Sequence, residues 1–361
     1  MRRHSIGRLV VAALLVAALL PAAAQAQVII KASDTVFMRL DAQIQSWADW
    51  QQDPVSRGYA QNLYIRRARV LLTGQVAPDV TFFIQTDNPN VGKVPKALGS
   101  GFLLQDAWAE WKIADGFAID AGEFLVPLNR NALESTLNFF TLDISPTSTV
   151  FSAPTQSNGL RDTGFEAKGY LIDGGRLEYR AALFQGIREA GARNAFRDSA
   201  YLQYNFLEKE RGYVYASSNL GKKAIFNING GYDAQKDYKA YSGNVFWTLP
   251  FGGGNEFGGQ VQDTHYDGGN FIKAIPKQND ILAELEIYFA PAKIQPFGKY
   301  ESQKFANTVD KTKDQTRWGA GLHYYVFGNN LKISGQYLHV SPKSPLRDSN
   351  EFTVAMQVWY Y

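Results

Sequence analysis

Basic side chains that could bind anions recur at alternating positions along the chain. The eight candidates are Arg39, Arg67, Arg69, Lys112, Arg130, Arg161, Arg180 and Arg317. A guanidinium group binds a phosphate or a carboxylate through two parallel hydrogen bonds, and rings of such groups inside a pore favour anions. These residues are therefore our candidates for lining a pore and binding anions.

Carboxylates occupy positions of the same kind in similar number. They include Asp41, Asp106, Glu110, Glu178, Glu284, Glu286 and Glu301. Rings of carboxylates favour cations. Two interpretations therefore stay open: a dedicated row of anion-binding arginines, and a wet polar interior whose charges are paired.

The segment Arg66-Arg67-Ala68-Arg69 has the sharpest local excess of positive charge. Successive side chains of a strand point to opposite faces. Arg67 and Arg69 therefore share one face, and Arg66 lies on the other. We expect that not all three arginines can face the same interior.

The residues needed for enzyme chemistry are scarce. Beyond residue 26 the only histidines are His265, His323 and His339, and the chain has no cysteine and no Gly-x-Ser-x-Gly segment. Nucleophilic catalysis needs a nucleophile, a base and an orienting group within hydrogen-bond reach. No metal site or cofactor site is predicted, because no histidines cluster and no glycine-rich loop opens a helix after a strand.

The N-terminus has the pattern of a secretory signal. Arg2, Arg3 and Arg8 precede an apolar run from Leu9 to Leu20, and small residues end at Ala26. The run is too short to span a membrane as a helix, which takes about 20 residues, so we expect cleavage after Ala26. We predict a signal peptide over 1–26 and a single domain over 27–361.

Removing this segment also removes the positive balance of the chain. The whole chain has 37 basic and 34 acidic residues, and the first 26 residues hold three arginines and no acid. The remaining chain is therefore neutral, so its charge gives no reason to expect a nucleic-acid partner.

The rest of the chain reads as strands with period-two alternation of apolar and polar residues. In the first, Met38, Leu40, Ala42 and Ile44 alternate with polar residues. Sixteen such segments are expected near 36–50, 62–75, 79–88, 103–113, 116–126, 161–171, 175–186, 196–207, 223–234, 237–249, 254–266, 279–290, 293–305, 315–327, 329–340 and 351–361.

Alternation alone suits a soluble β-sandwich or a membrane barrel, and the connections decide between them. Early and late in the chain, long and short connections alternate. Counting 212–221 as a seventeenth strand would put the late long loops on the wrong side, so we predict an irregular periplasmic connection over 208–222. Long outer loops, short periplasmic turns and an even strand count are typical of outer-membrane barrels. The alternating, aromatic segment 352–361 suits a closing strand that removes the free edge.

The longest connection, 127–160, is rich in apolar residues. It includes Leu137, Phe139, Phe140, Leu142, Ile144, Val150 and Phe151. A connection of this length without regular structure is generally functional or disordered, and this composition needs a packing partner. We expect it to fold into the barrel and narrow the pore; the alternative is a loop that covers a subunit interface.

Four segments resemble the phosphate-selective porin O and P family. They are Leu63–Gly74 with its Arg-Arg-Ala-Arg core, Leu104–Trp111, Asp120–Leu128 with Gly-x-Phe-x-x-Pro, and Arg161–Gly169 with Arg-Asp-x-Gly. The resemblance covers the second to sixth expected strands. It implies a 16-stranded barrel, a homotrimer, a long loop inside the pore, and Arg67, Arg69 and Arg161 as pore-lining residues. It implies selectivity for phosphate or another anion less directly.

The sequence therefore predicts an all-β fold: a 16-stranded antiparallel transmembrane β-barrel, porin-like, with the loop between strands 5 and 6 folded into the pore. The expected function is passive diffusion of small hydrophilic or anionic solutes across the outer membrane. The expected partners are outer-membrane lipid, these solutes and two further copies of the chain. The alternatives are an outer-membrane barrel enzyme and a structural or adhesive barrel.

Overall fold

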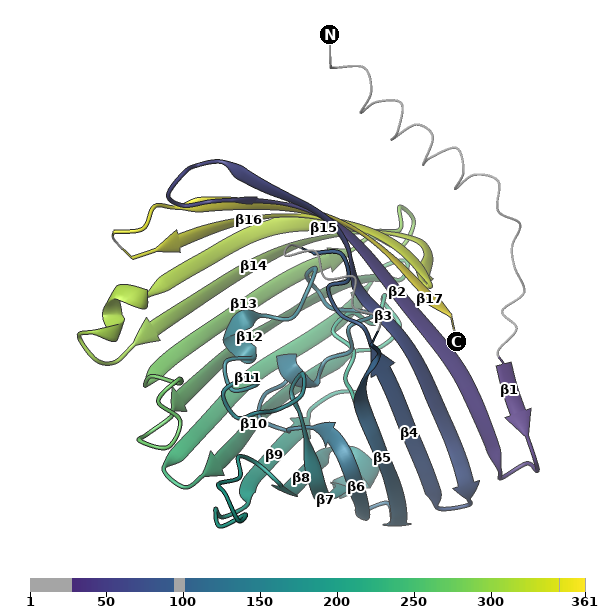
Figure 1. The fold of residues 1–361 in the computed structure, drawn as a ribbon. Helices are drawn as coiled ribbons and strands as arrows, with labels where there is room; N and C mark the ends of the chain where they lie inside the picture. The colour runs from purple at the N-terminus through teal and green to yellow at the C-terminus, as the bar shows by residue number, and fades with distance from the viewer. Residues whose placement is uncertain (1–27, 94–100, 344, 361) are drawn as a thin grey trace.

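Sixteen antiparallel strands, β2 to β17, close into the barrel shown in Figure 1. The computed structural model describes residues 28–93, 101–343 and 345–360, so the predicted signal segment 1–26 lies outside the described residues. Each barrel strand pairs with its neighbours in sequence, and β17 pairs with β2. This closure leaves no strand edge unpaired around the described barrel, as a sheet in lipid requires.

The strand bounds agree with the segments expected from alternation, and 212–221 is not a strand. The barrel strands are β2 (Phe37–Gln52), β3 (Tyr59–Ala77), β4 (Val80–Asp87), β5 (Leu103–Ala114), β6 (Phe117–Leu125), β7 (Arg161–Leu171), β8 (Leu177–Phe184), β9 (Arg197–Asn205), β10 (Ile225–Gln235), β11 (Tyr238–Phe251), β12 (Asn255–Asp267), β13 (Gln278–Tyr288), β14 (Ile294–Phe305), β15 (Gln315–Asn329), β16 (Leu331–Pro342) and β17 (Ser349–Tyr360).

Four short elements are not part of the barrel wall. They are β1 (Val28–Lys31), η1 (Asn131–Leu133), η2 (Pro146–Ser148) and η3 (Asp310–Lys313), and a further short helix, α2 (Ile172–Gly175), turns β7 into β8. Strand β1 was not expected from the sequence. It pairs with the start of β2, beyond the point where the pairing with β17 ends. No helix among the described residues is long and apolar enough to cross a membrane.

The faces of the strands are inverted relative to a soluble protein. In β13, Ile281 and Leu285 are 42% and 50% exposed, whereas Glu284 and Glu286 are each 2% exposed. Apolar residues therefore cover the outside and polar residues the inside, which is the arrangement expected of a barrel surrounded by lipid. The predicted alternation of this segment is confirmed.

Long connections lie at one end of the barrel and short ones at the other, with two exceptions. These are the short connection 236–237 at the first end and the long connection 206–224 at the second. The connections at one end are 53–58, the described parts of the segment between β4 and β5 (88–93 and 101–102), 126–160, 185–196, 236–237, 268–277, 306–314 and the described parts of the segment between β16 and β17 (343 and 345–348). Those at the other end are 78–79, 115–116, 172–176, 206–224, 252–254, 289–293 and 330. We call the second end periplasmic, following outer-membrane barrels. The expectation that the outer connections are all long is wrong for 236–237, a tight turn between β10 and β11.

The connection 126–160, here called the inner loop, crosses the interior of the barrel (Figure 1). On one side Thr141 Oγ1 donates to Glu284 of β13 at 2.7 Å. On another, Gln45 of β2 and Gln357 of β17 donate to the carbonyls of Thr136 and Leu137 at 3.0 and 3.1 Å. These contacts with strands far apart around the wall place the loop inside the barrel.

The periplasmic connection 206–224, here called the insert, also folds inward. Its Tyr215 exchanges backbone hydrogen bonds with the inner loop, donating to Leu133 at 2.9 Å and accepting from Ser135 at 2.8 Å. The sequence predicted an irregular periplasmic connection here but not its inward course. The insert and the inner loop share a buried apolar cluster with the inner faces of the neighbouring strands, so this part of the lumen is filled.

Candidate functional site

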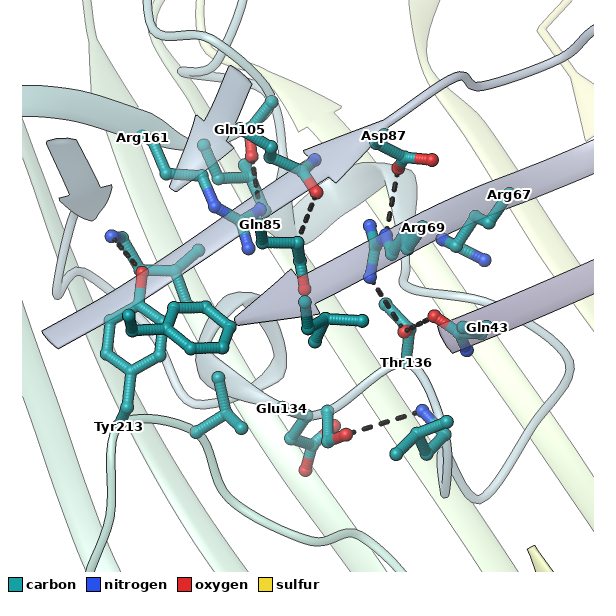
Figure 2. Close-up of a pocket in the computed structure, with 18 of the residues that line it drawn as sticks. Gln43, Arg67, Arg69, Gln85, Asp87, Gln105, Glu134, Thr136, Arg161 and Tyr213 are labelled. Atoms are coloured by element: carbon teal, nitrogen blue, oxygen red, sulfur yellow. Dashed lines mark hydrogen bonds and ion pairs between the residues drawn. The ribbon is translucent and has the colours of Figure 1, made fainter. Parts of the chain in front are cut away.

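A cavity of about 800 Å³ lies in the lumen between the inner loop and the wall formed by β2 to β7. Figure 2 shows its polar side chains: arginines, glutamines and Asp87 project from the strands, and Glu134 and Thr136 face them from the inner loop. The charged lining consists of five arginines and three carboxylates: Arg39, Arg66, Arg67, Arg69, Arg161, Asp41, Asp87 and Glu134. This lining is where the chain can interact with a solute.

A β-bulge brings Arg66 into the lumen beside Arg67. Gln45 of β2 pairs with Arg67, but the next residue of β2 pairs with Ile65, so Arg66 is the extra residue. Arg66 binds Asp143 of the inner loop at 2.8 Å, and Arg67 binds the other oxygen of Asp143 at 2.5 Å. The expectation that Arg66 cannot share the lumen with Arg67 and Arg69 is therefore wrong, because a bulge interrupts the strict alternation of a strand.

Asp143 connects the inner loop to Arg66 and Arg67 of β3. Burial alone would raise the pKa of Asp143, but the guanidinium groups of Arg66 and Arg67 hold this pKa well below its ordinary value. The carboxylate therefore stays ionised and paired. Asp143 was not among the residues singled out from the sequence, although it and Glu134 are the only two carboxylates of segment 127–160.

Arg69 and Arg161 are also paired with carboxylates. Arg69 Nε donates to Asp87 at 2.9 Å, and its Nη1 donates to Thr136 of the inner loop at 2.9 Å. Arg161 Nε donates to Asp106 at 3.1 Å. Both guanidinium groups line the cavity, as do those of Arg66 and Arg67. The structure thus brings together the three arginines implied by the family resemblance.

Of three other predicted residues, one lines the cavity, one lines a second hollow and one belongs to neither lining. Arg39 lines the cavity and is paired with Asp41. Lys112, paired with Asp115, lines a second hollow at the periplasmic end. Arg317 lies 3.8 Å from Glu301, outside the lining of the cavity.

Arg130 and Arg180 point into the lumen but are covered by the insert. Arg130 is fully buried, forms two hydrogen bonds to Glu210 at 2.7 and 3.0 Å, and lies 3.4 Å from the ring centre of Phe246. Arg180 donates to the backbone carbonyl of Gly212 at 2.8 Å. Both arginines hold the insert in place and do not line the open cavity.

An aromatic cluster lies at the periplasmic end of the cavity. The rings of Phe83, Trp108 and Tyr213 have centres 4.8 to 5.8 Å apart. Trp108, Tyr213 and Thr81 also line the second hollow, of about 340 Å³. These three side chains therefore stand between the cavity and the second hollow. The sequence did not single out these residues, because aromatic side chains are frequent throughout the chain.

A serine–histidine pair is present but has no room for a substrate. His323 Nδ1 lies 2.6 Å from Ser334 Oγ, and both are buried. The adjoining space holds about 10 Å³, and its only charged lining residue is Lys332. Nucleophilic catalysis requires an orienting group and space for the reacting atom. Over the described ranges, no cluster of three or more His, Cys, Asp or Glu residues suits a metal ion.

Comparison with known proteins agrees with this geometry. Residues 40–168 match the family model of phosphate-selective porin O and P. Among curated proteins, none matches the sequence significantly. The matched range contains most of β2, all of β3 to β6 and most of β7, and with them four of the five arginines of the cavity lining, Arg39 being the exception.

Solved outer-membrane channels share the fold at low sequence identity. An anion-selective porin from Comamonas acidovorans is 11% identical, with 90% of this chain and 99% of that chain covered and a TM-score of 0.63. OprB from Pseudomonas putida is 8% identical, with coverages of 89% and 93% and a TM-score of 0.64. OmpT from Vibrio cholerae, in its trimer form, is 12% identical, with coverages of 91% and 100% and a TM-score of 0.58.

The fold is therefore the closed barrel of these outer-membrane proteins, and residues 40–168 confirm the resemblance to the phosphate-selective porin O and P family.

Proposed function

We propose that the chain is an outer-membrane porin that lets small hydrophilic solutes, anions above all, cross by passive diffusion. The observation that carries the proposal is the cavity lining, with five arginines against three carboxylates inside a barrel whose outer face is apolar. Cationic groups in a pore favour anions. Because Arg66, Arg67, Arg69 and Arg161 each have a carboxylate partner, we expect a moderate anion preference.

The test is the reversal potential of the purified protein in planar lipid bilayers under a gradient of potassium chloride. We expect a stable conductance and a permeability ratio that favours chloride. Arg67→Ala and Arg69→Ala each remove one positive charge from the cavity and should lower the ratio about two- to fivefold at low salt. Lys311→Ala, in an exposed outer connection, removes the same charge far from the cavity and should leave the ratio unchanged. An impermeable protein would contradict the proposal.

We further propose that the working form is a homotrimer in outer-membrane lipid, exported with loss of residues 1–26. The trimer form of the similar OmpT barrel and the apolar outer face support this assembly. Cross-linking in detergent should give a trimer, and the mass of the membrane-extracted protein should correspond to a chain that begins at Gln27. A monomer, or a chain retaining the N-terminal segment, would argue against these two points.

A further inference from the structure

We propose that the arginine-lined cavity binds monocarboxylates that carry an apolar body, with benzoate as the simplest aromatic example, in preference to inorganic phosphate. The inference rests on the proposed function as a porin and names the class of solute for its cavity. It follows from the charge of the arginine cluster, from two donors without partners, and from the apolar side of the lining.

The arginine cluster has an excess of one positive charge. Its four guanidinium groups share three carboxylates: Arg66 and Arg67 bind Asp143, Arg69 binds Asp87, and Arg161 binds Asp106. One further negative charge balances such a cluster. A phosphate dianion brings more charge than the cluster lacks, and its four oxygens need more hydrogen-bond donors than the carboxylate partners of the cluster leave free.

One further carboxylate lies at the cavity. Glu134 is 3.4 Å from Arg130, and burial, opposed by Arg130, raises the pKa of Glu134 to about 7. Its charge is therefore only partly developed at neutral pH. It adds no full negative charge that would cancel the excess of the arginine cluster.

Two hydrogen-bond donors beside each other lack partners. Arg69 uses Nε and Nη1, and its Nη2 donates to no described residue. Gln43, directly opposite Arg69 in the ladder and 2% exposed, accepts from Thr136 but leaves its Nε2 without a partner among the described residues. Figure 2 shows Thr136 between these two side chains. Gln43 Nε2 is buried, and a buried donor without an acceptor is unfavourable. Arg69 belongs to the lining of the cavity, and a ligand carboxylate placed beside these two side chains would supply an acceptor.

The rest of the lining is suited to an apolar body. The inner loop contributes Leu137, Phe139 and Ile144, and the wall contributes Phe83 and Trp108. Phosphate and other small inorganic anions would leave these side chains against water. A hydrocarbon ring would cover them, and removal of apolar surface from water is favourable; aromatic pairs add a further attraction.

The test compares four probes on the intact protein in planar bilayers, each added to potassium chloride at fixed ionic strength. They are benzoate, acetate, phosphate and benzyl alcohol. We expect the concentration of benzoate that halves the chloride current to be about tenfold lower than that of acetate, because both carry the carboxylate and only benzoate buries a ring. Phosphate should resemble acetate, and benzyl alcohol, which has the ring but no charge, should not block.

Two variants separate the parts of the proposed site. Gln43→Leu keeps the volume but removes the free donor, and should weaken block by benzoate and acetate alike about threefold to tenfold. Leu137→Asn makes the apolar side polar and should weaken block by benzoate alone. Heat-modifiable migration on gels checks that each variant forms the barrel, and Lys311→Ala is the matched control.

The outcomes distinguish this inference from the proposed function. Conductance without any difference between benzoate and acetate, or strongest block by phosphate, overturns the inference and leaves the porin intact. Absence of conductance in every lipid tested overturns the porin itself. Equal benzoate block in Leu137→Asn and in the unchanged protein also overturns the placement of the apolar body.

Discussion

Replacing Asp143 by asparagine removes the one carboxylate that Arg66 and Arg67 share. The contacts of 2.8 and 2.5 Å would be lost, and the excess charge of the arginine cluster would rise from one to two. A unit charge 4 Å from a passing ion contributes about 1 kcal/mol in water. We therefore expect the chloride-to-potassium permeability ratio to rise up to about fivefold.

The salt dependence of this effect tests its electrostatic origin. Charges are screened over about 10 Å at 0.1 M salt and about 3 Å at 1 M, so the rise should be clear at 0.1 M and small at 1 M. Reversal potentials at both salt concentrations measure it. Asp310→Asn, in an exposed outer connection, removes the same charge far from the cavity and should change neither value.

The same substitution has a cost in stability. It leaves the buried guanidinium group of Arg67 and the partly buried one of Arg66 without their counterion, which costs on the order of 3 kcal/mol when a buried pair is broken. Unfolding in guanidinium chloride should therefore begin at a lower concentration. If the permeability ratio of Asp143→Asn equals that of Asp310→Asn at 0.1 M salt, the charge count of the cavity is wrong.

Three further predictions concern the loop, the insert and one strand. Burial and Glu284 raise the pKa of Glu134 to about 7 against the opposing effect of Arg130, so this side chain gains negative charge as the pH rises from about 6 to 8. The anion preference should therefore fall over that interval, and Glu134→Gln should abolish the fall. Glu210→Gln replaces the charged acceptor of the buried Arg130 with a neutral amide, which should loosen the insert and raise both the single-channel conductance and its noise. Unchanged current traces would show that the pair of Arg130 and Glu210 does not hold the insert in place. Gly122→Ala places a Cβ within 2.1 Å of a backbone carbonyl of the adjacent strand at a φ of 134°, so the yield of folded barrel on refolding should drop by more than half, and normal refolding would show that the strand can shift.

The barrel itself could be predicted from the sequence because its information is local. Alternation in segments such as 279–290 fixes which side chains face lipid, and the lengths of the connections fix which end each loop occupies. Both signals are read along the chain without knowledge of contacts. The same parity placed Arg67 and Arg69 in the lumen together, and the structure has both lining the cavity.

What the sequence could not provide depends on pairing between strands or on packing inside the barrel. The bulge at Arg66 is defined by a shift in the pairing of β2 with β3 at Gln45, and no residue type in that segment predicts it. The inward course of the insert depends on the pairing of Tyr215 with Leu133 and Ser135. Arg130 and Arg180 were expected in the lumen, but their cover by the insert could not be foreseen.

The inner loop has a further consequence for the order in which the barrel assembles. Gln45 belongs to the first barrel strand and Gln357 to the last, the two bond to each other at 2.8 Å, and each donates to one of two successive carbonyls of the inner loop. This docking site does not exist until the first and last strands have met. These two contacts of the inner loop can therefore form only after the barrel has closed, and once formed they hold the first strand and the last strand together at the seam.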